Sequence, residues 1–194
     1  MATPQILDRF MPRADVRERF ETTIRAPAPV VMDIATTFDM QSLFPVRAIF
    51  RTREWLTCAR RGPPRQAQQL LAEMTALGWG VLDQEPGRRI VCGAVCQPWL
   101  ANVEFSAIES GAFAAFAEPD RVKIAWTLEA DPIDPSTTRF AHETRAVATD
   151  ESARAKFRRY WRWARFGIVG IRLLILPAIR RAAERRVGRP SPTG

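Results

Sequence analysis

Residues that carry metal, redox and acid–base chemistry are scarce in this chain of 194 residues, which has one histidine, His142, and three cysteines, Cys58, Cys92 and Cys96. On one strand Cys92 and Cys96 would stand about 13 Å apart, at roughly 3.3 Å per residue, too far for a shared disulfide or metal ion. Three cysteines without regular spacing argue against a disulfide framework and a zinc site. They predict a reduced, cytoplasmic protein without metal.

Motifs for nucleophilic catalysis and phosphate binding are also missing. The chain has no Gly-x-Ser-x-Gly sequence and no phosphate-cradling glycine loop. Its first twelve residues lack the apolar segment of a signal peptide. One apolar stretch, Phe166–Ile179, covers only 14 residues, whereas a bilayer-spanning helix needs about 20, so we expect a buried helix there. These absences leave no cofactor to expect.

Positive charge gathers at the end of the chain. Residues 150–194 hold 12 basic and 3 acidic residues (+9), and residues 1–149 hold 17 and 18 (−1), which together give the net charge of +8. Such a concentration can attract anionic lipid or, less favoured, nucleic acid. Alternatively, arginine simply fills the solvated face of a helix. The composition leaves both explanations open.

We predict one domain over residues 16–187, between a flexible leader (1–15) and a disordered tail (188–194). An apolar fraction of 46% and a charged fraction of 26% are ordinary for a globular domain. Alternation over Arg17–Arg25 predicts a half-buried strand. Helical patterns follow over Val30–Phe38, Asp39–Arg61 and Gln66–Leu77, so we expect a helical insertion after the first strand.

Strand patterns dominate the second half. Trp79–Gln84 and Arg88–Val95 flank a Glu-Pro-Gly turn, and two longer strands are predicted over Val122–Asp131 and Thr137–Thr149. The last helix should start at Asp150, a good N-cap, and be kinked or ended by Pro177. From Asp150 to Leu176 it would extend about 40 Å, enough to cross a whole sheet.

Short sequence blocks in this order resemble a known superfamily. They are Ile24-Arg25-Ala26-Pro27, Leu77-Gly78-Trp79, Glu85-Pro86-Gly87-Arg88-Arg89-Ile90-Val91, Pro98-Trp99, Phe116-Ala117-Glu118-Pro119, Lys123-Ile124-Ala125-Trp126, Glu143-Thr144-Arg145, Thr149-Asp150 with Phe157, Tyr160 and Trp161, and Ala182-Ala183-Glu184. The chain resembles the START/SRPBCC superfamily, which includes polyketide cyclase/dehydrase-like proteins, and within it an uncharacterised bacterial group. The resemblance implies an α+β helix-grip fold, in which a curved antiparallel sheet wraps around a long C-terminal helix. It also implies a hydrophobic cavity, but no shared catalytic residue.

Strand alternation nominates the lining of that cavity, together with an apolar stripe on the last helix made of Ala153, Phe157, Tyr160, Ala164, Ile168, Ile171 and Ile175. The predicted ligand-binding residues are Phe20, Trp79, Trp99, Ile124, Trp126, Phe140, His142, Thr144, Tyr160 and Trp161. Polar groups among aromatic side chains are typical of a small-ligand pocket. Glu143 and Arg145 fall on the opposite face, where we expect surface ion pairs.

Three functions remain open at this point. The first is non-catalytic binding of a hydrophobic small molecule or lipid. The second is a cyclase or dehydratase acting on an aromatic or polyketide-like substrate, with His142 as its acid–base group. A core histidine with a hydrogen-bond partner is the simpler interpretation of that residue. The third is docking of the basic C-terminal helix on an anionic membrane or, less favoured, on nucleic acid. The sequence does not determine the oligomeric state.

Overall fold

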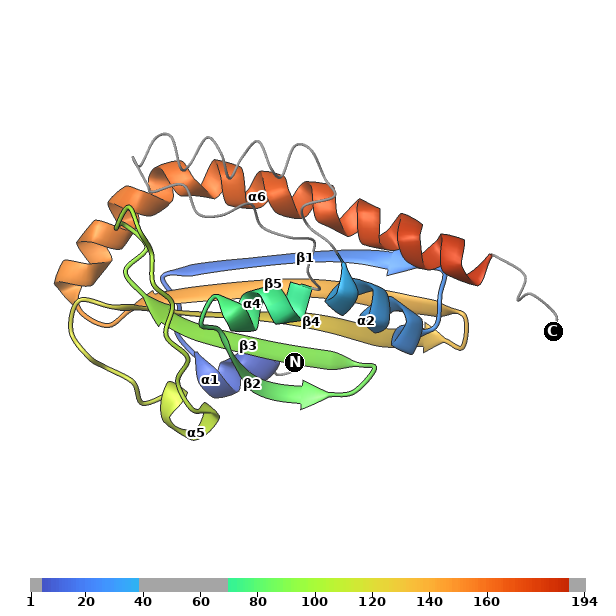
Figure 1. Cartoon of the computed structure of the whole chain (residues 1–194), viewed down its shortest axis with the longest axis horizontal. Coiled ribbons are helices and arrows are strands. Elements are labelled where there is room, and N and C mark those ends of the chain that lie inside the picture. The colour runs from blue at the N-terminus through green and yellow to red at the C-terminus, as the bar shows by residue number, and fades with distance from the viewer. Residues whose placement is uncertain (1–4, 39–69, 189–194) are drawn as a thin grey trace.

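A computed structural model describes residues 5–38 and 70–188. The helical pattern of Asp39–Arg61, Cys58 and the tail beyond Gly188 lie outside these residues. Five strands form one antiparallel sheet in the order β1-β5-β4-β3-β2 (Figure 1). Their bounds are β1 (Val16–Ile24), β2 (Gly80–Glu85), β3 (Arg89–Cys96), β4 (Val122–Asp134) and β5 (Thr137–Ala148).

The helices of the described residues cover both faces of the sheet. They are α1 (Ile6–Phe10), α2 (Ala28–Thr37), α4 (Leu70–Ala76), α5 (Ser110–Phe113) and α6 (Glu151–Val187). α6 runs along the whole length of the sheet, and α2 lies beside its C-terminal part (Figure 1). An antiparallel sheet held by one long C-terminal helix is the α+β helix-grip arrangement, so the predicted fold class is confirmed.

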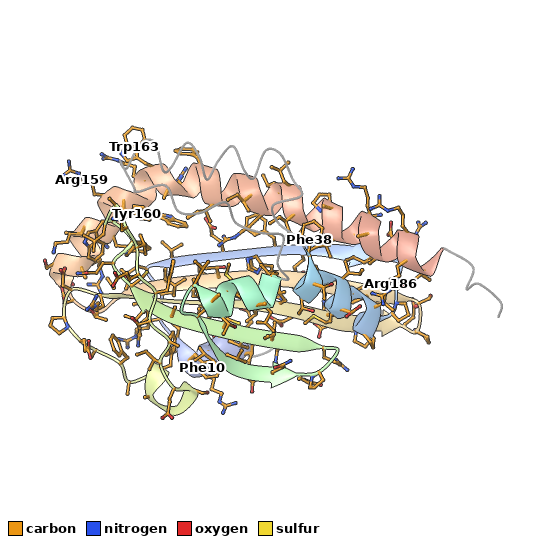
Figure 2. All side chains as sticks on the ribbon, viewed as in Figure 1. Phe10, Phe38, Arg159, Tyr160, Trp163 and Arg186 are labelled. Carbon is orange, nitrogen blue, oxygen red and sulfur yellow. The ribbon has the colours of Figure 1, made fainter. Side chains whose placement is uncertain are left out.

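Part of the predicted leader is helical and packed. Leu7 and Phe10 of α1 are 0% and 3% exposed, and Met11 after it is 2% exposed. These side chains join Val91 and Ala125 of the sheet in an apolar cluster on the face away from α6. Phe10 lies on that side of the sheet in Figure 2. Local patterning gave no signal here, because five residues are too few to show a helical period.

Strand register sorts the side chains into two faces. Phe20 pairs with His142, which pairs with Leu128, and all three belong to the face under α6, here called the α6 face. One residue along, Arg19 pairs with Glu143 on the opposite face, here called the α1 face. A shift of one residue would exchange the two sets, so the register decides what each face can do.

The predicted surface ion pair of Glu143 and Arg145 is wrong, because both residues are buried, each 1% exposed. Arg145 Nε donates to Glu143 Oε1 at 2.7 Å, and Arg145 Nη1 donates to Met11 O at 2.8 Å. Glu143 also accepts from Arg17 and Arg19, at 3.0 and 3.1 Å. The α1 segment covers the pair, which alternation along one strand cannot reveal.

α6 begins as predicted and continues further than predicted. Asp150 caps it, with Oδ1 accepting from the Ala153 backbone N–H at 2.7 Å. The helix then runs 37 residues and passes through Pro177, so of the two predicted effects of this proline, a kink or an end, the end is wrong. Pro177 is exposed, so the carbonyl that loses its helical donor can be hydrated. Burial of Ile179 and Ala183 in the core stabilises the continuation.

Candidate functional site

The two ends of α6 are anchored to the rest of the protein. At the first end Phe157 is 1% exposed, and Arg154 Nε donates to Asp15 Oδ1 at 2.9 Å. At the far end Ile179 is 1% exposed. Arg186 pairs there with Asp33 of α2, and Glu184 accepts from the Arg25 backbone N–H at 3.2 Å. Packing and polar contacts therefore fix both ends against the sheet and α2.

The middle of α6 is packed less closely. No residue from 158 to 171 is fully buried, a span of 14 residues or about 21 Å of helix. Its inward side chains are only half-buried, and they are Tyr160, Trp161, Ala164, Ile168 and Ile171. Tyr160 points beneath the helix, while Arg159 and Trp163 point away from it (Figure 2). The stripe predicted from the sequence faces inward, and over this span its side chains are only partly buried.

The strands beneath this span show the same incomplete packing. Ile124 and His142 lie on the central strands β4 and β5, face α6 and are half-buried. Their chain neighbours on the α1 face, Ala125 and Glu143, are 0% and 1% exposed. Ile124 and His142 therefore keep some accessible surface on the face of the sheet that lies under α6.

The structure brings six of the ten predicted binding residues onto the α6 face of the sheet. They are Phe20, Ile124, Trp126, Phe140, His142 and Thr144. Trp126 contacts His142 on β5 and Trp79 before β2, with ring centroids 6.3 and 6.2 Å apart. Phe140 is 0% exposed in the main core, so it supports the others without accessible surface of its own.

Three of the predicted residues cluster at the start of α6. Trp161 stacks near Phe157, with ring centroids 5.9 Å apart. Trp99 and Tyr160 pack against the same cluster, and Lys156 Nζ lies 5.5 Å from the Trp99 ring. Unlike the six residues on the sheet, these three come from the loop after β3 and from α6.

His142 is held as a neutral side chain. Its Nδ1–H donates to the Thr127 carbonyl at 2.7 Å, since a carbonyl only accepts, and Nε2 lies 3.4 Å from Thr144 Oγ1. Burial lowers the His142 pKa to about 4, and the positive charge of Arg172 adds to that effect. At neutral pH, Nε2 is therefore a hydrogen-bond acceptor.

Sequence reasoning missed Arg172, the one charged residue buried on the inward side of α6. It is 9% exposed, pairs with Glu18 of β1 and lies with its guanidinium 5.8 Å from the centre of the Phe20 ring. Burial lowers the Arg172 pKa, and Glu18 opposes that shift. A signal was present, because Arg172 is the single charge in the apolar stretch Phe166–Ile179.

The described residues offer no metal site, since no three of their His, Cys, Asp and Glu side chains cluster. Within residues 5–38 and 70–188, no helix combines the length and apolar character that crossing a bilayer requires. The buried helix predicted for Phe166–Ile179 is wrong on its outward side, where Phe166 and Leu173 are 66% and 59% exposed.

No family model matches the chain, and no curated protein sequence matches it. Among solved structures it is similar to the Zhui aromatase/cyclase from a Streptomyces species, at 13% identity and a TM-score of 0.35, over 92% of this chain and 99% of that one. A Deinococcus radiodurans protein follows at 12% and 0.29, over 78% and 99%. A putative uncharacterized Rhizobium leguminosarum protein gives 14% and 0.25, over 81% and 96%. At these TM-scores the fold assignment depends on the strand order and α6.

Proposed function

We propose that this protein binds a hydrophobic small molecule or lipid between the α6 face of the sheet and the middle of α6. One observation carries the proposal: α6 is anchored at both ends, while its central 14 residues include none that is fully buried. The half-buried Ile124 and His142 beneath that span support it. So does the sequence resemblance to the START/SRPBCC superfamily, to which we propose the chain belongs.

The chemistry of the lining favours binding over catalysis. Aromatic and aliphatic side chains surround a few polar groups, which is typical of sites that hold apolar ligands. His142 is a weak base with its pKa near 4, far from the value near the working pH that acid–base catalysis needs. A cyclase or dehydratase using His142 is therefore the less favoured function.

Filling the proposed space tests this function. Nile red, a neutral apolar dye whose emission rises in apolar surroundings, would report binding by titration. Ile168→Trp adds bulk on the inward side of α6, and Leu173→Trp adds the same bulk outward, where Leu173 is 59% exposed. We expect the wild type and Leu173→Trp to bind alike and Ile168→Trp to bind at least tenfold more weakly. Equal binding by both variants, or none by the wild type, would contradict the proposal.

A second candidate function concerns the outward side of α6. Trp163 and Phe166 are 72% and 66% exposed there, among the exposed arginines 158, 159, 162 and 165. Within the described part of the chain, none of these four arginines forms an ion pair with a carboxylate. Aromatic side chains interleaved with unneutralised arginine are typical of helices that lie in an anionic membrane interface. We propose that this surface docks on anionic lipid.

Vesicle co-sedimentation distinguishes that surface from a merely solvated one. We expect binding to phosphatidylserine-rich vesicles, little binding to phosphatidylcholine vesicles, and loss of binding at high salt. Trp163→Ser with Phe166→Ser should weaken binding, whereas Ile133→Ser, near the end of β4 and 59% exposed, should not. Tighter binding to oligonucleotides than to vesicles would make nucleic acid the partner instead.

A further inference from the structure

Arg172 places more hydrogen-bonding capacity beneath α6 than its partner uses. A guanidinium carries five N–H donors. Among the described residues Arg172 makes one side-chain hydrogen bond, from Nη1 to Glu18 Oε2. A buried donor without an acceptor is destabilising, and an apolar side chain at this position would generally serve stability better. Within the described residues no second side-chain acceptor meets the other N–H donors of Arg172, so they can serve an acceptor between the helix and the sheet.

The groups around Arg172 define what that acceptor can be. Glu18 pairs in register with Thr144, and Phe20 with His142, so all four lie side by side on the α6 face. Thr144 supplies a hydroxyl, and His142 presents the bare Nε2 because its Nδ1–H is bonded to Thr127. The site thus offers donors from Arg172 and one acceptor from His142.

Charge limits the ligand further. The guanidinium of Arg172 and the carboxylate of Glu18 cancel, and His142 is neutral, so this polar cluster has no net charge. A ligand carboxylate would bring a second negative charge next to Glu18 in surroundings from which water is largely excluded, which is unfavourable. A neutral oxygen atom meets the spare N–H donors without that opposition.

From this arrangement we infer that Arg172 anchors an uncharged oxygen, of the carbonyl type, at the polar end of an otherwise apolar ligand. The inference rests on the proposed function and specifies its ligand class. Phe20 and Trp126 would contact the apolar part next to that oxygen, since Phe20 lies under the guanidinium and Trp126 pairs in register with Thr144. Glu18 then acts as a positioning residue, because it holds the guanidinium and excludes anionic ligands.

Three probes of equal chain length test the inference by displacement of Nile red: methyl nonyl ketone, undecane and undecanoate. For the wild type at mildly alkaline pH we expect the ketone to bind about ten- to a hundredfold more tightly than undecane, the range expected of one hydrogen bond from a charged donor. Undecanoate should bind more weakly than the ketone. Arg172→Met should remove the preference for the ketone and keep undecane binding.

Glu18→Gln gives an independent readout if Arg172→Met fails to fold. It leaves the cluster with a net positive charge, so undecanoate should gain at least tenfold in affinity and become the preferred probe. Thr22→Val, on the same face of the same strand, is the control and should leave the ranking unchanged. If no probe and no Nile red binds to the wild type, the proposed function itself fails. If Nile red and undecane bind but the ketone has no advantage, or Glu18→Gln leaves undecanoate weak, the inference alone is overturned.

Discussion

Replacing Glu143 by leucine should destabilise the protein far more than breaking an exposed ion pair does. The carboxylate is 1% exposed and accepts from Arg145, Arg17 and Arg19. Its loss would leave the Arg145 guanidinium, 2% exposed, without one of its partners. Removing one member of a buried pair costs about 3–5 kcal/mol, whereas an exposed pair contributes about 0–1 kcal/mol. The two interpretations of this pair therefore differ by a measurable amount.

Urea unfolding measures the difference directly, with the midpoint and slope of each transition compared. For a chain of this length a loss of 3–5 kcal/mol also lowers the melting temperature by roughly 6–20 °C. Arg139→Gln is the matched control, because Arg139 lies on the same strand and face but pairs with Asp131 at an exposed position. It should cost less than about 1 kcal/mol.

A double variant separates the ion pair from general damage to the strand. Glu143→Leu with Arg145→Met removes both buried charges, so it should regain part of the stability that Glu143→Leu loses. A loss below about 1 kcal/mol for Glu143→Leu alone would refute the argument from burial. So would an Arg139→Gln loss of the same size as the Glu143→Leu loss.

Three further predictions concern separate parts of the fold. Gly93→Ala should lower the free energy of unfolding by about 1–3 kcal/mol, because a Cβ there would lie 2.8 Å from the Phe113 ring. Gly111→Ala, with open space around the added Cβ, should not lower it. The His142 pKa is about 4 in the folded protein and about 6.5 in the unfolded chain, so protonation at low pH favours unfolding. The contribution of His142 to the free energy of unfolding should be complete above pH 6.5 and about 2 kcal/mol smaller at pH 5. Calorimetry at both pH values should show a smaller fall for His142→Gln. Asp150→Ala should lose about 0.5–2 kcal/mol of stability in urea, because it removes the α6 cap, and an unchanged midpoint would contradict that role.

The sequence predicted the elements whose own residues specify them. Alternation of Phe20, Thr22 and Ile24 predicted β1 within one residue at each end, and the Glu-Pro-Gly turn predicted the β2–β3 hairpin. Asp150 marked the start of α6 through its capping oxygen. In each case, short-range hydrogen bonding or a repeating pattern carries the information. The fold class was implied by the family resemblance that these elements support in this order.

Features that depend on how the helices pack against the sheet were not predicted. Glu143 and Arg145 look solvated along β5, and only the packing of α1 makes them a buried pair. Helix propensity ends α6 at Pro177, and only the core beneath Ile179 shows why it continues. Arg172 stood out in the sequence as a lone charge, but its pairing with Glu18 spans 154 positions. Tertiary context decides each of these.

Helix α6 contacts the rest of the protein through Arg154 near its start and through Arg186 near its end. Because both ends are held, we expect that α6 does not swing open about one end as a hinged flap does. In the proposed function, a ligand would then enter and leave beside the middle of α6. The residence time of the ligand would then depend on how often residues 158–171 of α6 open locally. It would not depend on a rigid-body movement of the whole helix. Removing the contact of Arg154 or that of Arg186 should therefore speed ligand dissociation and leave the proposed lining residues unchanged.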